Sequence, residues 1–381
     1  MSQYESLVRG VHTVPCYTIR NRTMKSTTLQ RASRPLLLGL GLMATAAHVA
    51  AAGHGDEDID GSFNNGDHSH NTSGWFNNTF IGGYGELHLN LNSNSDNEID
   101  FHRWVLFINH TFNDKISLYG EFELEHSLAG DGKPGEVELE QAYIDIALNG
   151  GTNFKAGLFL LPVGTLNESH EPNTFYGVER NPIEKNIIPT TWWEAGLGLS
   201  GKLDNGLGWE VAAHSGLNVP ANYKIRSGRQ KVAEAVAEDA AFTARLTYSG
   251  SGFTVGGFAQ YQSDITQGRD NADATLVGAT LDANMGDFRL RGLVASWDIG
   301  GAAASAADAD KQWGYYIEPS YRLSDSLGVF VRYNEWEDYS GDHDAVSVGV
   351  NYWPHENVVF KADYTDSDSE ESVNLGVGYQ F

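Results

Sequence analysis

Apolar and polar residues alternate along most of the chain. In residues 81–92, isoleucine, glycine and leucine occupy one set of alternate positions, and Tyr84, Glu86, His88 and Asn90 occupy the other. A repeat of two residues is typical of a β-strand with one apolar face. The pattern recurs to the end of the chain and predicts sixteen strands: Ile81–Asn92, Ile99–His110, Ile116–Leu124, Val137–Leu148, Phe154–Leu160, Ala195–Leu203, Trp209–Ser215, Phe242–Tyr248, Phe253–Tyr261, Val277–Ala283, Phe288–Val294, Trp313–Tyr321, Leu327–Tyr333, Val346–Tyr352, Val358–Tyr364 and Val373–Phe381.

Two of these segments are irregular. Ile99–His110 carries apolar residues on both faces around Arg103 and Trp104, and the alternation in Val137–Leu148 reverses midway. An extra residue in one strand, a β-bulge, produces such a reversal. We therefore expect a bulge in Val137–Leu148.

The connections between the strands alternate in length. Short links rich in Gly, Asn, Asp and Ser follow the even-numbered strands, whereas the long loops Pro162–Thr191, Leu217–Asp239, Ser263–Ala274 and Asp298–Gln312 follow odd-numbered ones. Outer-membrane barrels have an even strand number, short periplasmic turns and long external loops. A sheet crosses lipid only when it closes, with its apolar face outward. The sequence thus predicts an all-β fold, a 16-stranded antiparallel transmembrane β-barrel; a soluble sandwich is the alternative.

The first 52 residues are typical of a removable export signal. Lys25, Arg31 and Arg34 precede an apolar stretch, Leu36–Ala47, and small residues follow it. A membrane-spanning helix is the alternative, but the stretch is short for one. We expect translation to start at Met24, and we divide the chain into an extension with signal peptide (1–52), an acidic segment rich in His, Asp and Asn (53–78) and a barrel (79–381).

Composition and charge narrow the function further. The chain has 381 residues with 25 Lys and Arg against 50 Asp and Glu, and Cys16 is its single cysteine. A disulfide framework is excluded. Six of the cations and one of the acids lie in residues 1–52, so the exported chain carries a net charge of about −30. Such a charge excludes a surface that binds nucleic acid phosphates.

At this point the sequence resembles a known family. The segment Val373–Phe381 is similar to the last strand of Gram-negative outer-membrane proteins, which ends in Phe. The stretch FKAGLFLLPVG (Phe154–Gly164), after EQAYIDI (Glu140–Ile146), resembles the phosphate-selective porin O and P family. The resemblance implies a homotrimeric 16-stranded porin among outer-membrane lipid and lipopolysaccharide, whose Phe381 is read by the barrel assembly machinery. It does not carry over phosphate selectivity, because no matching ladder of Arg and Lys is evident.

The polar faces of the strands predict the pore lining. The acidic candidates are Glu86, Glu121, Glu123, Glu125 and Asp145, and Arg103 is an ambiguous neighbour. The basic candidates are Arg245, Arg289, Arg291, Arg322 and Arg332, interrupted by Asp282 and Glu318. Opposed charged walls set ion preference and order polar solutes. The alternative is that these charges pair with one another and stiffen the barrel.

Two long loops carry further candidates. We expect Pro162–Thr191 to fold into the barrel and narrow it, because loops of this length usually have a function. Its constriction candidates are Glu168, His170, Glu171, Glu179 and Arg180; an external lid or a latch between the subunits of a trimer is the alternative. The second loop carries a basic cluster for capturing anions, Lys224, Arg226, Arg229 and Lys231, with a solvated tip or a lipopolysaccharide contact as alternatives.

Metal and enzyme chemistry are weakly indicated. Asp56, Asp58, Asp60 and Asp67 approximate a calcium loop in which Asp replaces the final Glu, and His54, His68 and His70 favour zinc instead. Gly196–Gly201 matches a dinucleotide-binding pattern but lies in a strand, so we expect no cofactor there. A catalytic barrel using His126 or His214 is an alternative. The main prediction is a passive outer-membrane channel for ions and small hydrophilic solutes, not an enzyme, with a weak cation preference. A closed adhesive or structural barrel and a phosphate- or anion-selective channel are the alternatives.

Overall fold

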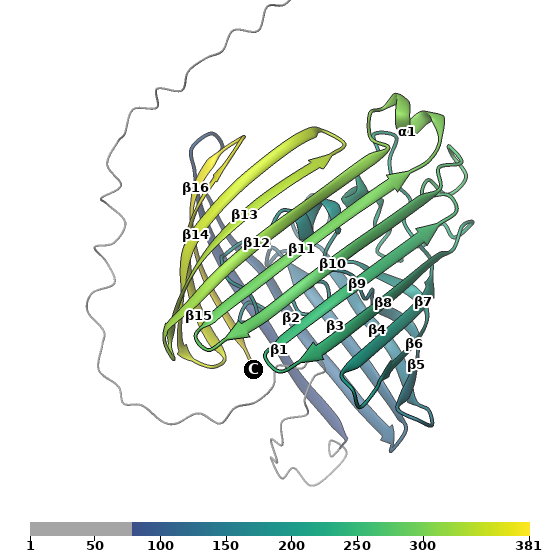
Figure 1. The fold of residues 1–381 in the computed structure, drawn as a ribbon, viewed down its shortest axis with the longest axis horizontal. Coiled ribbons are helices and arrows are strands. Elements are labelled where there is room, and N and C mark those ends of the chain that lie inside the picture. Colours follow the sequence, from purple (N-terminus) through teal and green to yellow (C-terminus); the bar gives the residue numbers. More distant parts are fainter. Residues whose placement is uncertain (1–77) are drawn as a thin grey trace, which may run out of the picture. The chain divides into compact units, whose positions relative to one another are not determined.

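The computed structural model describes residues 78–381. Sixteen antiparallel strands form one closed barrel in which β1 pairs with β16 (Figure 1). The strands are β1 (Thr79–Asn92), β2 (Glu98–Asn113), β3 (Ile116–Glu125), β4 (Val137–Ala147), β5 (Thr152–Leu160), β6 (Trp193–Lys202), β7 (Leu207–His214), β8 (Ala241–Gly250), β9 (Phe253–Gln262), β10 (Ala274–Met285), β11 (Phe288–Ile299), β12 (Lys311–Ser324), β13 (Leu327–Asp338), β14 (Gly341–His355), β15 (Val358–Ser367) and β16 (Glu371–Gln380). The predicted fold class is confirmed.

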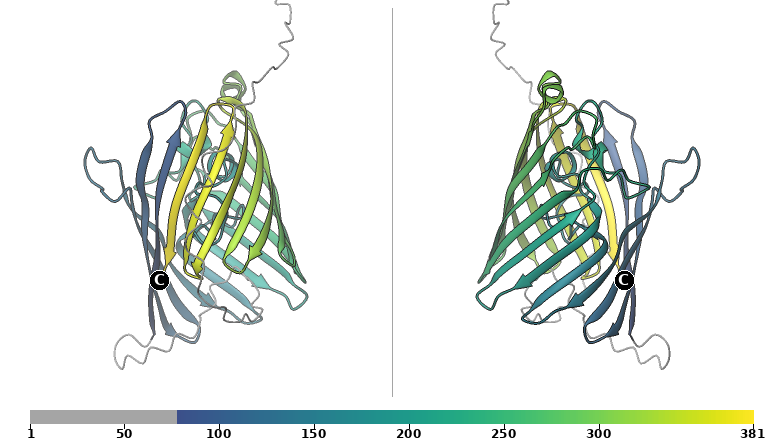
Figure 2. Two further views of the ribbon diagram at one scale, coloured as in Figure 1. Left: turned by 90° about the vertical axis from the view of Figure 1, so that its left-hand side faces the viewer. Right: turned by 90° about the vertical axis from the view of Figure 1, so that its right-hand side faces the viewer.

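The two rims of the barrel differ. Short turns join the strands at one rim. Longer segments join most of them at the other rim, which also carries α1 (Ala302–Ala306) and the short β13–β14 and β15–β16 turns (Figures 1 and 2). Two further helical turns, η1 (Ile183–Ile187) and η2 (Ile225–Gly228), lie in the long connections after β5 and β7. Within the described residues, no helix has the length and apolar character needed to cross a membrane.

The apolar faces of the strands point outward. Leu246, Val277 and Val348 are exposed by 60%, 50% and 47%. Residues on the opposite, inward face of the sheet, such as Gln260 on β9 and Asn334 on β13, are buried. A chain in water would hide its aliphatic face, so this inverted arrangement matches a barrel whose outer face meets hydrocarbon.

Both irregular strands contain a change of register. In β4, Gln141 pairs with Glu121 and Leu139 pairs with Phe122, so Glu140 is the extra residue of the predicted bulge. In β2, Arg103 pairs with Glu86 and Asp100 pairs with His88, so two residues face the single Leu87. The bulge in β2 explains why the apolar pattern around Arg103 was ambiguous.

Candidate functional site

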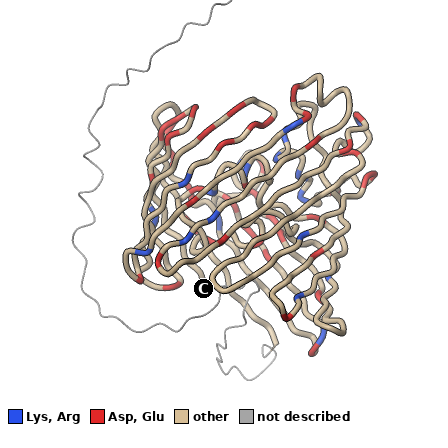
Figure 3. Tube along the Cα trace, viewed as in Figure 1, with Lys and Arg blue, Asp and Glu red and all other residues tan. Residues whose placement is uncertain are grey.

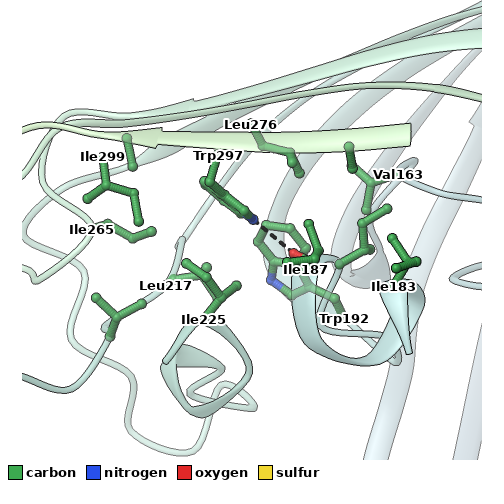
Figure 4. Close-up of a cluster of buried hydrophobic side chains, with 14 of the residues drawn as sticks. Val163, Ile183, Ile187, Trp192, Leu217, Ile225, Ile265, Leu276, Trp297 and Ile299 are labelled. Atoms are coloured by element: carbon green, nitrogen blue, oxygen red, sulfur yellow. Dashed lines mark hydrogen bonds between the residues drawn. The ribbon is translucent and has the colours of Figure 1, made fainter. Parts of the chain in front are cut away.

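The long connection between β5 and β6 lies inside the barrel, as we expected. We call residues 161–192 the inner loop. Its apolar residues, including Ile183, Ile187 and Trp192, pack against inward side chains of β10 and β11 such as Leu276 and Trp297 (Figure 4). The indole N–H of Trp297 donates to the carbonyl of Ile187 at 2.8 Å. The barrel interior therefore contains an apolar core that holds the inner loop to one wall.

A buried carboxylate organises the inner loop. Glu184 is fully buried and accepts hydrogen bonds from the backbone N–H groups of Thr165 and Leu166 at 2.5 and 2.6 Å. The hydroxyl of Thr165 and the amide of Asn181 donate to it at 2.7 and 3.0 Å. The hydroxyl of Tyr316 on β12 lies 3.4 Å away. Sequence reasoning missed Glu184, because nothing in the local pattern distinguishes it from a solvated loop acid.

The inner loop also reaches the strands on either side of the closure between β1 and β16. Glu179 lies 3.0 Å from Nδ1 of His88 on β1. The backbone N–H of Val178 donates to Asp363 on β15 at 2.7 Å. The carbonyl of Tyr176 lies 3.3 Å from Arg332 on β13. The loop is thus an internal element, and the alternative of an external lid is excluded.

One predicted constriction residue lies in an acidic pocket. His170 is buried, with Nε2 3.8 Å from Glu121 and 3.6 Å from Glu140. Burial alone lowers the pKa of His170, but the two carboxylates outweigh it and raise the pKa to about 9. The imidazolium therefore ties the inner loop to β3 and β4.

The other constriction candidates lie along the same loop. Glu168 is ion-paired to Arg245 at 2.5 Å. Arg180 donates to the hydroxyl of Thr191 at 2.9 Å. The backbone carbonyl of Glu171 accepts hydrogen bonds from Thr174, and one oxygen of its carboxylate, Oε2, has no hydrogen-bond partner within residues 78–381.

The predicted acidic residues of β1 and β3 face the interior. Glu86 and Glu123 are buried and lie 3.1 and 3.6 Å from Nε of Arg103, which also faces inward. The bulge in β4 adds Glu138 and Glu140 to this wall, since it brings Leu139 outward and both neighbours inward. Sequence reasoning missed these two glutamates, although the reversed alternation was the signal that would have found them.

The remaining acidic candidates lie near the two ends of the wall. Glu125, the last residue of β3, has carboxylate oxygens close to those of Glu136 and Glu138. Asp145 pairs in register with Ser117 and Lys155 near the short-turn rim. We refer to Glu86, Glu121, Glu123, Glu138 and Glu140 as the acidic wall.

The basic candidates face inward but have local partners. Arg245 pairs with Glu168 and Glu210, and Arg332 lies 3.1 Å from Glu318. Arg289 and Arg291 share Asp282 at 2.5 and 3.2 Å, and Arg322 stacks on Trp353 at 4.0 Å. Four of the five cations are therefore paired with carboxylates of the same or an adjacent strand or of the inner loop. This arrangement favours the pairing alternative for the basic side of the interior.

The basic cluster after β7 is dispersed. Arg226 and Arg229 donate to backbone carbonyls of the inner loop, at 2.5 Å to Thr190 and 2.5 Å to Thr191. Lys231 is ion-paired to Glu136 and Glu138, and Lys224 lies 5.7 Å from the ring of Tyr339. The structure does not gather these four cations into an open anion pocket, because they instead hold the loop to its neighbours.

Two remaining candidates lie at the chain ends. Phe381 exchanges backbone hydrogen bonds with Gly83 at 2.9 Å each, and its ring stacks on Trp104. The calcium candidates Asp56, Asp58, Asp60 and Asp67, the start at Met24 and the export signal lie outside the described residues.

Charge is distributed unevenly on the barrel. Acidic residues are frequent at the rim with the long loops, for example Asp338, Asp342 and Asp344 around the β13–β14 turn (Figure 3). Inside, the glutamates of the acidic wall lie on β1, β3 and β4 and the five arginine candidates lie on β8, β11, β12 and β13, and the inner loop contacts both groups. Charged walls of this kind suit the passage of hydrated, polar solutes.

Comparison with known proteins gives the family. A model described as Gram-negative porin matches residues 40–372. The chain belongs to the Gram-negative porin family. This porin is therefore an outer-membrane channel, and the soluble sandwich is excluded.

Solved structures and one curated relative are similar to this porin. The fold is similar to that of the anion-selective porin from Comamonas acidovorans, with a TM-score of 0.59, 10% identity and coverage of 80% of this chain and 99% of that one. The channel DcaP of Acinetobacter baumannii has a TM-score of 0.56 and 12% identity, with coverage of 80% of this chain and 97% of that one. OmpF of Salmonella typhi has a TM-score of 0.56 and 15% identity, with coverage of 80% of this chain and 97% of that one. An uncharacterised protein of Aquifex aeolicus is 29% identical over 76% of each chain.

Proposed function

We propose that this porin is a narrow, passive channel with a weak preference for cations. The observation that carries the proposal is the difference between the two sides of the interior. The five buried glutamates of the acidic wall contact Arg103, His88, His170 and Lys231, whereas four of the five basic candidates are paired locally with carboxylates, two of them with the same Asp282. In a passage of low dielectric, unbalanced charge sets ion preference.

The width of the channel follows from the inner loop. Because the loop contacts β1, β3, β8, β12, β13 and β15, it spans much of the interior. We therefore expect a channel that admits ions and small hydrophilic solutes and gives small conductance steps in planar bilayers. A fully closed barrel would give no conductance steps.

Planar-bilayer recording tests both statements. The wild-type protein is expected to give stepwise currents and, in a salt gradient, a reversal potential of the sign for cations. Glu123→Gln removes one acid from the wall and should shift the reversal potential toward anions. Glu337→Gln is the matched control, because Glu337 binds the indole of Trp313 away from the acidic wall. A clear anion preference of the wild type would overturn the proposed selectivity.

A clear anion preference of the wild type would instead favour the alternative of an anion channel like the phosphate-selective porins that the sequence resembles. One neighbour of similar fold is described as anion-selective, so the fold itself is compatible with either sign. We infer cation preference from the residues of this chain and not from its neighbours. Currents measured in chloride and phosphate salts would distinguish general anion passage from phosphate selectivity.

We further propose that the barrel acts without catalysis and assembles as a homotrimer among lipid and lipopolysaccharide. His214 is buried beside Thr243 and Trp192, and neither of these two neighbours is a carboxylate. One similar structure, OmpT of Vibrio cholerae, is described in a trimer form. Sedimentation of the purified protein in detergent tests the trimer. Pull-down of the assembly machinery by the wild type but not by Phe381→Ala tests the role of Phe381.

A further inference from the structure

Two histidines and an aspartate converge at the outer end of β2 and β3. Nδ1 of His102 and Nδ1 of His126 lie 3.2 and 2.8 Å from the same oxygen of Asp100. Asp100 and His102 lie near the start of β2, and His126 directly follows the end of β3. The cluster lies toward the long-loop rim, on the interior side and above the acidic wall.

The donor set and its spacing suit a divalent transition metal. Zinc binds histidine nitrogen and carboxylate oxygen at about 2.0–2.2 Å, usually with tetrahedral geometry. In such a tetrahedron neighbouring ligands lie about 3.3 Å apart, close to the spacing seen here. The side chains of His102, His126 and Asp100 are 28%, 31% and 15% exposed, so water has access to a fourth position.

The backbone positions these side chains before any ion binds. The bulge in β2 turns His102 to the side of His88, on whose ring it stacks at 4.7 Å. The N–H of His126 donates to the carbonyl of His102 at 3.1 Å. His126 and Ser127 have φ values of 49° and 51°, which non-glycine residues adopt infrequently and which often mark functional positions.

His88 lies beside the cluster. Both of its ring nitrogens face carboxylates, Glu179 at 3.0 Å and Glu86 at 3.2 Å. Metals bind the neutral imidazole, so Asp100, His102 and His126 together offer one carboxylate oxygen and two imidazole nitrogens.

The surrounding charge also accommodates a dication. Arg103 contributes one positive charge, against the carboxylates of Asp100, Glu86, Glu123 and Glu179. Arg103 Nη2 lies 3.3 Å from Nε2 of His102. A metal on Nδ1 requires a proton on Nε2, and Arg103 would then rely on Glu86 and Glu123, which it already contacts.

We propose that Asp100, His102 and His126 form a binding site for a divalent transition metal of the zinc class at the outer mouth of the channel. The site captures the ion by nitrogen and oxygen donors before it meets the acidic wall. Hard cations such as Ca²⁺ prefer more numerous oxygen ligands and bind here poorly.

Calorimetry with Zn²⁺ on the folded, full-length barrel in detergent tests the site. His54, His68 and His70 are replaced by Ala in every sample, so that the N-terminal segment contributes no histidine ligands. His102→Ala/His126→Ala should weaken zinc binding more than about 100-fold, since even the loss of outer-shell partners costs 10- to 100-fold. Asp100→Asn is a second, milder variant that keeps the side-chain volume.

His343→Ala is the matched control. His343 also pairs with two aspartates at the same rim, Asp368 at 2.9 Å and Asp338 at 3.6 Å, but has no second histidine in that pair. It should leave zinc affinity unchanged. Visible absorption with Co²⁺ in place of Zn²⁺ should show the intense bands of a tetrahedral nitrogen and oxygen site in the wild type and lose them in the double variant.

Two outcomes would overturn the proposal. One is wild-type zinc affinity no greater than that of the double variant, which would leave the three groups as a hydrogen-bonded cluster only. The other is an equal loss in His343→Ala, which would indicate general binding at the acidic rim. Neither outcome bears on the proposed channel function, because current steps in metal-free salt test that separately.

Discussion

Removing the carboxylate of Glu184 should release the inner loop from the barrel interior. Glu184 accepts hydrogen bonds from Thr165, Leu166 and Asn181 within a site that excludes water. In Glu184→Ala those donors remain buried and lose their shared acceptor. Glu184→Gln keeps the volume and one oxygen, so it retains part of the set.

The magnitude follows from the number of donors. A hydrogen bond to a charged group contributes about 1.5–3 kcal/mol, and each buried donor left unsatisfied costs about 1–3 kcal/mol. Because the loop relaxes and water enters, the losses do not add in full. We expect the free energy of loop docking to fall by about 3–4 kcal/mol in Glu184→Ala and by about half of that in Glu184→Gln.

A buried cysteine reports the docking equilibrium. Val163 is buried beside the Glu184 cluster, and Val163→Cys in a chain without Cys16 provides a single thiol. A water-soluble maleimide labels it only when the loop undocks, so Glu184→Ala should raise the labelling rate about 100- to 1,000-fold, at about 1.4 kcal/mol per tenfold. Glu168→Gln is the comparison, because it removes a single, partly exposed ion pair of the loop with Arg245 and should raise the labelling rate much less. An unchanged labelling rate in Glu184→Ala would refute the idea that this carboxylate holds the loop.

Three further predictions concern other contacts of the interior and the closure. The pKa of His170, about 9, lies above its ordinary 6.5, so its contribution to loop docking is complete below pH 6.5 and is lost as pH rises through 9; thiol labelling should therefore accelerate between pH 7 and 10, and an equal acceleration in His170→Asn would argue against this cause. Phe381→Ala removes the ring stacked on Trp104 and should lower the stability of the closure by about 0.5–1.5 kcal/mol, measured as a lower unfolding temperature in detergent than for Phe360→Ala corrected for ring exposure. Lys231→Met removes the cation from Glu136 and Glu138 and should move the reversal potential toward cations with little change in stability; an unmoved potential would place these carboxylates outside the ion path.

The periodic part of the fold was predictable, because each strand has one face in lipid. The sixteen strands, their antiparallel arrangement and a bulge in β4 follow from alternation and loop length, whereas the position of the bulge at Glu140 comes from the pairing of β3 with β4. The inward course of the inner loop was predicted from its length, but its contacts were not. Glu184 and the ion pair of Glu168 with Arg245 depend on the path of the loop in space, which periodicity does not encode.

The basic loop after β7 illustrates the same limit. A cluster of cations in a sequence indicates a charged segment, and binding of an anion is only one of the roles that such a segment can have. Here Arg226 and Arg229 bind backbone carbonyls, whose positions depend on how two distant loops meet. The orientation of His102 was hidden for a similar reason, since the bulge in β2 moves it from the face that strict alternation assigns.

The contacts of the inner loop with β1 and β15 couple permeation to the integrity of the wall. Glu179 and Val178 are neighbours in sequence, yet Glu179 contacts β1 and Val178 contacts β15, the strand next to β16, so the two residues bridge the place where the first and last strands meet. Movement of the loop out of the barrel, which would widen the passage, would also break these two contacts beside the β1–β16 closure. We therefore expect the width of the channel to change only through small side-chain movements. A solute too large for that width would be excluded, because admitting it would require the barrel wall to open.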